Sequence, residues 1–287
     1  MILIGGSSSR ELAVRVAEKT NIELAEIDFR KFPDNEIYIR LFSDVSDKKC
    51  IVIHTTRTND DIIELFLLLD LLRDLGAGEV HTIVPYLAYS RQDKRFNEGE
   101  ALSAKTILKL INKFSDSITT VNCHFLDSEG EFMFHGIKIK NLDAFPLVAE
   151  YFRKKFKKPV VVSPDKGALR YAKGAANIIR CDFDYLEKKR ISDDKVVMSV
   201  RNLDVYDKDV IILDDIISTG TTIIEAVKIL RKYGARSISA GCVHGVFSHG
   251  IEKLNKALDN LVCTDTIQTQ VSKVSISSLI AENLKQK

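Results

Sequence analysis

The amino-acid sequence predicts an α/β fold in which one type of domain occurs twice, each copy a mainly parallel sheet flanked by helices. Short apolar runs recur, each followed by a polar loop and an amphipathic helix, which is typical of strands buried on both faces of a parallel sheet. Two such units return later at a nearly constant spacing. In addition, 287 residues are long for one compact domain and comfortable for two.

The chain opens with an apolar strand expected at Ile2–Ile4, then a loop of two glycines and three serines, then a helix from about Arg10. The same order returns at Val160–Val162, followed by the loop 163–167 and a helical Ala168–Ala172. The centres of the two strands are 158 residues apart (161 − 3). This is the first half of the repeat.

The second half begins with a strand at Ile51–His54, a polar loop over 55–59 and a leucine-rich helix that ends at Gly76-Ala77. Its later counterparts begin at Val210 and end at Gly234-Ala235, which gives separations of 159 (210 − 51) and 158 (234 − 76). We therefore predict domains over residues 1–140 and 141–287. The tail after about residue 275 either stays with the second domain or packs back on the first.

The stretch Val210–Thr222 carries the most specific signal. Its apolar run ends in Asp214-Asp215, a loop of hydroxyl residues and one glycine follows, and a helix is expected after it. Open α/β sheets bind ligands at the carboxyl ends of their strands, and such a loop can direct backbone N–H groups and hydroxyls onto one phosphate. Since carboxylates repel phosphate, the two aspartates would hold sugar hydroxyls or a cation beside it. The alternative is a strand end and a simple helix cap.

Because the first copy has no acidic residue at 55–59, the pattern places a phosphosugar in the second domain. Two polar segments of the first copy also flank predicted strands: Lys31–Glu36 precedes an alternating strand at Ile37–Leu41, and Tyr89–Phe96 follows a strand at Ile83–Pro85. The loop Arg91–Glu100 holds three basic residues and lacks an apolar pattern, so it suits a mobile anion-binding lid or a solvated turn.

A further charged loop is expected in the second copy. Residues Tyr185–Lys195 stand between strand-like segments at Ile178–Cys181 and Val196–Val200. The composition of this loop fits a hairpin connection with surface charge as well as it fits a site.

Composition limits the classes of function. Apolar residues make up 45% and charged residues 29%, as in globular proteins, and no apolar run approaches the roughly 20 residues of a membrane span. With no signal-peptide pattern either, we expect a cytoplasmic protein. The net charge of +2 provides no overall field for nucleic acid or an anionic membrane. The five scattered cysteines indicate reduced thiols instead of disulfides or a zinc site.

The six histidines form no His-x-x-x-His or Glu-x-x-His pair, so a metal site built from protein ligands alone is not expected. His124 and Asp165 each follow an apolar run and are placed at strand ends. A magnesium ion bound mainly by substrate phosphates needs only one or two such ligands.

With these residues in view, the chain resembles the ribose-phosphate pyrophosphokinase family over nearly its whole length. Val210–Thr222 is similar to that family's ribose-phosphate signature, Lys31–Glu36 to its Lys-Phe-x-Asp-x-Glu segment, Tyr89–Lys94 to its Tyr-x-Arg-Gln-Asp-Lys segment, and Ser163–Asp165 to its Ser-Pro-Asp. The resemblance implies two tandem type I phosphoribosyltransferase-like domains. It departs from the family where Asn122-Cys123-His124 replaces Asp-Leu-His, and Thr221 a glycine.

The resemblance also implies roles for individual residues. Lys188 and Arg190 match a Lys-x-Arg pair that stabilises the transferring group, and His124 and Asp165 would bind the magnesium–phosphate system. ATP would be bound by five residues of the first domain, partly from a neighbouring subunit: Phe32, Asp34, Glu36, Arg91 and Gln92. Ribose 5-phosphate would be bound by seven residues of the second: Asp214, Asp215, Ser218, Thr219, Gly220, Thr221 and Thr222.

The reaction implied is transfer of the diphosphoryl group of ATP to the 1-hydroxyl of ribose 5-phosphate, giving 5-phosphoribosyl 1-diphosphate and AMP, with Mg²⁺ as cofactor. No P-loop pattern occurs, so ATP needs another pocket. A phosphoribosyltransferase is one alternative, and a non-catalytic regulatory paralogue is another. An ATP pocket shared between subunits implies a homodimer or larger homo-oligomer.

Overall fold

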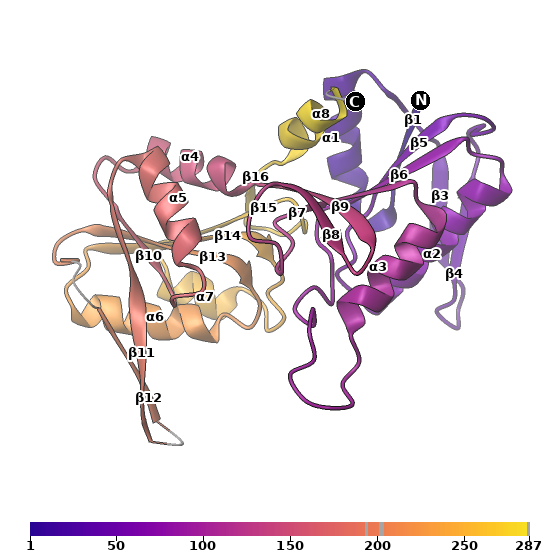
Figure 1. The fold of residues 1–287 in the computed structure, drawn as a ribbon. Helices are drawn as coiled ribbons and strands as arrows, with labels where there is room; N and C mark the ends of the chain where they lie inside the picture. Colours follow the sequence, from indigo (N-terminus) through magenta and orange to yellow (C-terminus); the bar gives the residue numbers. More distant parts are fainter. Residues whose placement is uncertain (193–194, 201–203, 286–287) are drawn as a thin grey trace. The chain divides into compact units, whose positions relative to one another are not determined.

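The computed structural model describes residues 1–192, 195–200 and 204–285, with 187–192 and 195–200 described by their backbone alone. The chain divides into two compact units (Figure 1). Unit 1 comprises Met1–Asp143 with the later segments Thr266–Gln268 and Ser275–Lys287, and unit 2 comprises Ala144–Asp265 and Thr269–Val274. The C-terminal segment thus belongs to the first unit.

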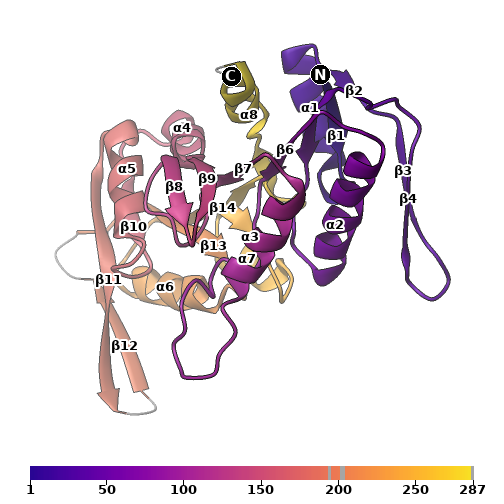
Figure 2. The ribbon, with the colours of Figure 1, turned by 45° about the vertical axis from the view of Figure 1, so that its right-hand side comes forward.

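The sheet of unit 1 runs in the order β2-β1-β5-β6-β7-β9-β8. Parallel pairing extends from β2 across to β9, and β8 closes the edge antiparallel to β9. A separate antiparallel ribbon is formed by β3 and β4 (Figure 2). The strands are β1 (Ile2–Gly5), β2 (Glu23–Leu24), β3 (Ile27–Lys31), β4 (Ile37–Leu41), β5 (Lys49–Ile53), β6 (Glu79–Val84), β7 (Ser117–Val121), β8 (Gly130–Phe134) and β9 (Ile137–Leu142).

Helices lie on both faces of this sheet. Leucines of α2 and α3 pack with Ile2, Ile4 and Val52 in one core cluster. The apolar face of α1 packs close to β1, where the methyl of Ala13 approaches Gly5. The C-terminal helix α8 packs on α1. The helices are η1 (Ser7–Ser9), α1 (Arg10–Thr20), α2 (Asn59–Asp74), α3 (Ser103–Phe114) and α8 (Ser277–Lys285).

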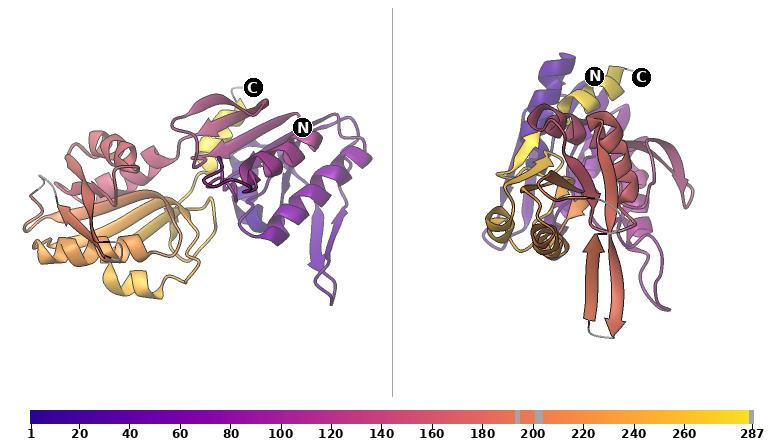
Figure 3. Two further views of the ribbon diagram at one scale, coloured as in Figure 1. Left: turned by 60° about the horizontal axis from the view of Figure 1, so that its bottom comes forward. Right: turned by 90° about the vertical axis from the view of Figure 1, so that its left-hand side faces the viewer.

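The sheet of unit 2 runs in the order β12-β11-β10-β13-β14-β15-β16 and is parallel from β11 to β16. Helices α6 and α7 cover the face that carries Val160, Val210 and Ile238, and α4 and α5 lie on the other (Figure 3). The elements are α4 (Phe145–Lys155), β10 (Val160–Ser163), α5 (Leu169–Ile179), β11 (Asp182–Ser192), β12 (Lys195–Val200), β13 (Asp209–Ile217), α6 (Thr221–Lys232), β14 (Ser237–Gly245), α7 (Glu252–Ala257), β15 (Asn260–Thr264) and β16 (Ser272–Val274).

The two sheets repeat one topology. In each, the first strand of the unit pairs in parallel with the unit's second strand on one side and with a central strand on the other: the order is β2-β1-β5-β6 in unit 1 and β11-β10-β13-β14 in unit 2. The helices after β1 and β10, namely α1 and α5, each contain 11 residues. The prediction of a duplicated α/β fold with mainly parallel sheets is confirmed.

Three local predictions are wrong. Ile178–Cys181 is no strand, because the apolar face of α5 continues to Ile179 and the chain turns at Arg180 with a left-handed φ of 64°. Residues 185–192 form β11 instead of a loop, since β11 pairs with β12 in an antiparallel ribbon (Figure 3). The apolar strand at Val210 does not stop at Leu213 but continues through both aspartates to Ile217.

Two further expectations concern burial and membranes. The five cysteines are free, four are buried, and Cys181 is half-buried, as predicted for reduced thiols. Among the described residues, no helix has the length and apolar character needed to cross a membrane.

Candidate active site

The two aspartates of β13 lie beyond the point where this strand stops pairing with β10. Pairing with β10 covers Val210–Ile212, whereas pairing with β14 continues to Ile217. Asp214 and Asp215 therefore follow the last rung shared with β10, at the carboxyl edge of the sheet. This is the edge at which open α/β sheets bind ligands.

The carboxyl group of Asp214 has a raised pKa, so it keeps its proton to a higher pH than usual. Burial is the main cause that raises its pKa, and the nearby carboxylates of Asp215 and Asp165 raise it further. Backbone N–H groups hold the pair in place: Asp215 N donates to Asp214 Oδ1 (2.9 Å), and Ile216 N donates to Asp215 Oδ1 (2.8 Å). Hydroxyl donors or a cation brought here would relieve the repulsion among the three carboxylates.

The loop after β13 is held by the segment that follows β14. The carbonyl of Ile217 accepts from Phe247 N (3.1 Å), and that of Ser218 accepts from Ser248 N (3.0 Å). The helix α6 begins directly after Gly220, so Thr221 occupies its first turn and has no need of the left-handed conformation. The hydroxyls of Thr219 and Thr221 are exposed and 3.2 Å apart.

Gly220 is required by both its backbone and its surroundings. Its φ of 77° lies in the left-handed region that favours glycine. A Cβ added there would come within 2.9 Å of Leu254 Cδ1 at the start of α7. The loop Ser218–Thr222 is therefore fixed between α6 and α7, with backbone N–H groups of a helix N-terminus beside hydroxyl donors, an arrangement that suits a phosphate.

A cavity of about 280 Å³ lies beside this loop, and basic side chains line it. These side chains belong to none of the sequence motifs. Lys228 comes from α6, whereas His249 and Lys253 come from the segment after β14. Thr219 and Thr221 form part of the same wall. Sequence reasoning missed these residues, because they lie on α6 and on the segment after β14, which only the fold brings together.

Asp165 serves as a cap in its own loop. Its Oδ1 accepts from Gly167 N (3.0 Å) and Ala168 N (3.3 Å), and its carbonyl accepts from Ser163 Oγ (2.8 Å). The carboxylate is thus held at the carboxyl end of β10, close enough to raise the pKa of Asp214. Asp165, Asp214 and Asp215 form the acidic side of the site in unit 2.

His124 belongs to unit 1, where it follows β7 and is exposed. The amide of Asn122, which replaces an acidic residue of the family pattern, donates to Asp143 Oδ1 (2.8 Å). No group of three or more His, Cys, Asp or Glu side chains within the described ranges could hold a metal ion alone.

Phe32, Asp34 and Glu36 share the exposed tip of the β3–β4 ribbon. The tip is a tight turn in which Phe32 N donates to Glu36 O (2.8 Å) and Glu36 N donates to Asp34 Oδ1 (3.2 Å). The ring of Phe32 packs edge-on against Tyr38, with centroids 5.7 Å apart, and is 46% exposed. The tip therefore presents an aromatic surface and two carboxylates together.

Arg91 and Gln92 lie in the loop between β6 and α3. Arg91 is exposed, whereas Gln92 is half-buried and held by hydrogen bonds to Glu100 and to the carbonyl of Lys94. Lys188 and Arg190 lie on β11 opposite Met198 and Val196 of β12, and their side chains fall outside the described residues.

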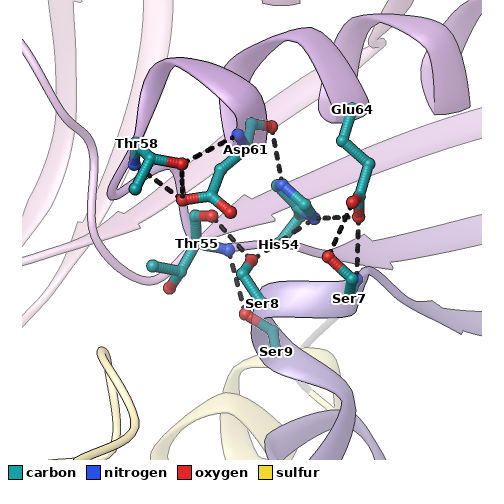
Figure 4. A network of polar contacts seen from close by, with 8 residues as sticks. All are labelled: Ser7, Ser8, Ser9, His54, Thr55, Thr58, Asp61 and Glu64. Atoms are coloured by element: carbon teal, nitrogen blue, oxygen red, sulfur yellow. Dashed lines mark hydrogen bonds and ion pairs between the residues drawn. The ribbon is translucent and has the colours of Figure 1, made fainter. Parts of the chain in front are cut away.

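The carboxyl ends of β1 and β5 in unit 1 are filled by a network of the chain's own polar groups (Figure 4). Ser7 donates to the Glu64 carboxylate through its N–H (2.8 Å) and its Oγ (2.6 Å). Ser8 Oγ donates to Thr55 O (2.7 Å), and the hydroxyl of Thr55 donates to Thr266 O. The two copies thus differ at the strand ends that correspond to Asp214-Asp215.

Two family models match the chain, one in its first half and one in its second. A model described as the N-terminal domain of ribose phosphate pyrophosphokinase matches residues 1–114, and a phosphoribosyl transferase domain matches residues 141–278.

Two relatives that match over their whole length are both named ribose-phosphate pyrophosphokinase. The ribose-phosphate pyrophosphokinase 2 of Archaeoglobus fulgidus is 42% identical over 286 residues, covering 99% of this chain and 100% of the relative. The ribose-phosphate pyrophosphokinase of Methanothermobacter thermautotrophicus is 40% identical, with 99% and 100% covered. Among solved structures, phosphoribosylpyrophosphate synthetase from Mycobacterium smegmatis aligns with a TM-score of 0.84 at 27% identity, covering 99% of this chain and 97% of that one.

Proposed function

The chain belongs to the ribose-phosphate pyrophosphokinase family, and we propose that it transfers the diphosphoryl group of ATP to the 1-hydroxyl of ribose 5-phosphate, giving 5-phosphoribosyl 1-diphosphate and AMP. The observation that carries this function is the match to curated pyrophosphokinases from end to end at about 40% identity. The duplicated domain adds support, because a phosphoribosyltransferase that consumes the diphosphate has no need of the first copy.

The acceptor half of the site is proposed in unit 2. Asp214 and Asp215 accept hydrogen bonds from the ribose hydroxyls, which act as donors toward carboxylates. The loop Ser218–Thr222 binds the 5-phosphate through hydroxyls and backbone N–H groups at the start of α6. The sugar is thereby oriented with its 1-hydroxyl as the nucleophile, so no protein side chain needs to form a covalent intermediate.

The donor half is proposed in the first domain's segments. Phe32 supplies an aromatic face for adenine, and Asp34 and Glu36 line the same pocket, since all three share one exposed tip. Arg91 and Gln92 bind ATP from the loop before α3. An exposed tip also supports a site completed by a neighbouring subunit, so we propose a homodimer or larger homo-oligomer that works in the cytoplasm.

Charge neutralisation is the main task during diphosphoryl transfer. Magnesium, when bound, would polarise the phosphates and neutralise their charge. His124 and Asp165 would bind to this magnesium–phosphate system, and Lys188 and Arg190 would stabilise the group in transfer. Alignment of the 1-hydroxyl with the β-phosphorus supplies the rest of the rate enhancement.

Purified protein with ATP, Mg²⁺ and ribose 5-phosphate is expected to release AMP in equal amount to 5-phosphoribosyl 1-diphosphate. Phosphorus NMR distinguishes this diphosphate ester from the ADP and sugar phosphate that an ordinary kinase would make. Release of ADP, or absence of turnover from folded protein, would reject the proposed reaction. Turnover also separates the enzyme from a regulatory paralogue, which is not favoured by the whole-length relatives.

A further inference from the structure

We propose that Glu100 is a positioning residue that fixes the orientation of the Gln92 side-chain amide and thereby selects the 6-amino edge of the ATP purine. The inference rests on the proposed function, because it takes Gln92 as part of the ATP site. It assigns a role to an acidic residue that lies eight positions beyond Gln92 (100 − 92), in a loop that holds three basic and three acidic residues.

Glu100 closes the loop before α3 through hydrogen bonds to residues along it. Its Oε2 accepts from Gln92 Nε2 (3.1 Å) and from Phe96 N (2.8 Å). Its Oε1 accepts from Asn97 Nδ2 (2.6 Å), and its carbonyl accepts from Arg95 Nε (2.8 Å). One carboxylate therefore holds three N–H donors from three positions of the loop.

These donors keep the carboxylate ionised. Hydrogen bonds from Asn97 are the largest cause that lowers the pKa of Glu100 to about 2, with Phe96 N and Gln92 adding to the effect. An ionised carboxylate accepts hydrogen bonds and cannot donate them. The Gln92 amide must therefore turn its nitrogen toward Glu100, which fixes the choice between the two amide orientations.

The second amide hydrogen of Gln92 is also used, because Nε2 donates to Lys94 O (3.1 Å). The backbone of the residue is held as well: its N donates to Tyr89 O (3.0 Å), and its carbonyl accepts from Ala104 N (3.3 Å) in the first turn of α3. With both N–H groups engaged inside the loop, the group that Gln92 offers to a ligand is the amide oxygen, an acceptor.

An acceptor in a fixed orientation distinguishes purines. The 6-amino group of adenine donates hydrogen bonds, whereas the 6-oxo group of hypoxanthine accepts them and would face the oxygen of Gln92 with no proton between. ATP is accordingly favoured over ITP. A neutral amide at position 100 could present its nitrogen instead of an oxygen. Only Lys94 O would then favour the present orientation of the Gln92 amide, so the preference against the 6-oxo purine would weaken.

The test compares Glu100→Gln with Glu98→Gln, which makes the same change of charge two residues away. Among the described residues, the Glu98 carboxylate has no hydrogen-bond or ion-pair partner, so it is a matched control. For Glu100→Gln we expect KM for ATP to rise about 3–10-fold and the ratio of kcat/KM for ATP over ITP to fall by a similar factor, the effect of one hydrogen bond. KM for ribose 5-phosphate and the thermal midpoint should stay unchanged, and Glu98→Gln should resemble the wild type.

A double-mutant cycle shows whether Glu100 acts through Gln92. In a Gln92→Ala background, Glu100→Gln should no longer change the ATP/ITP ratio, because the amide that it orients is gone. An unchanged ratio in the single Glu100→Gln variant, or an equal change in the Gln92→Ala background, would overturn the proposal. Wild-type protein that makes no AMP would instead reject the proposed function, so the two failures are distinguishable.

Discussion

Nδ1 of His54 lies 3.6 Å from Oε1 of Glu64 in the interior of unit 1, where His54 is inaccessible to solvent and Glu64 nearly so (Figure 4). Burial lowers the pKa of His54 more than the carboxylate raises it, so the ring is neutral near pH 7. Its Nε2 lies 2.7 Å from Asp61 O, which places the proton on Nε2. Glu64 therefore depends on the two donors of Ser7 more than on His54.

Glu64→Ala should destabilise the protein by about 1–3 kcal/mol, because both Ser7 donors lose an acceptor that is itself buried. Urea unfolding followed by circular dichroism measures the change. Glu11→Ala is the control, since Glu11 is exposed and pairs with Arg15 one turn away at 3.6 Å. Such surface pairs contribute about 0.3–0.5 kcal/mol, so equal effects of the two substitutions would contradict the assigned role of Glu64.

The sequence located strands correctly where the periodicity of apolar residues matches the burial of the strand. The strands β1, β4 and β10 lie within one residue of their predicted bounds. Short apolar runs and strictly alternating runs are both typical of β-strands. The run at Ile178–Cys181 is too short to distinguish a strand from a helix end, and there the helix continued. The aspartates were placed beyond their strand because charge usually ends a buried run, but pairing with β14 extends β13 past them.

In the candidate site, too, the sequence revealed local motifs but not the contacts that depend on folding. Local motifs indicated the phosphate loop and the ribbon tip, whose residues are neighbours in sequence. The cavity lining by Lys228, His249 and Lys253, and the hydrogen bond from Gln92 to Glu100, depend on how the chain folds. Likewise, the bond of the Thr55 hydroxyl to Thr266 O joins residues 211 positions apart, which no local pattern reveals.

Gly220→Ala should raise KM for ribose 5-phosphate by about tenfold or more and lower the thermal midpoint. The added methyl meets Leu254 Cδ1 at 2.9 Å, and φ of 77° is unfavourable for alanine. Gly136→Ala isolates the backbone cost, because Gly136 has φ of 81° with nothing within 4 Å of the added Cβ. A Leu254→Ala background should reduce the effect of Gly220→Ala; if it does not, the steric explanation is wrong.

Lys188→Ala should lower the rate of AMP formation by about 10²–10³-fold at saturating substrates, the usual loss when a group that stabilises transition-state charge is removed. Lys189→Ala is the matched control, since it removes the same charge one position along β11. The far-UV circular dichroism of both variants should match the wild type. Equal turnover of Lys188→Ala and wild type would remove Lys188 from the mechanism.

Asp214→Asn should stabilise the protein and lower its activity, and the gain in stability should depend on pH. A raised pKa means that the folded state holds the proton of Asp214 more tightly than the unfolded state. The stability linked to this proton is fully present below the ordinary value of 3.8 and is lost as pH rises through the folded-state pKa. Asparagine carries no charge, so the variant should melt about 2–4 °C higher at pH 7.5, with a gain that shrinks on acidification, while turnover falls at least about tenfold.

Asp209→Asn, at the other end of the same strand, should show the opposite sign. Arg236 lowers the pKa of Asp209 through hydrogen bonds from Nη2 (2.7 Å) and Nε (3.2 Å), and Ser237 Oγ adds a third (2.6 Å). A lowered pKa contributes stability above the ordinary value of 3.8 that is lost as pH falls through the folded-state value. This variant should therefore melt lower than the wild type at pH 7.5, by an amount that stays level down to the ordinary value of 3.8 and decreases below it, with turnover retained. Thermal melts of both variants from below pH 3.8 up to pH 8 would decide, since shifts of the same sign at pH 7.5 would contradict the assigned environment of Asp214.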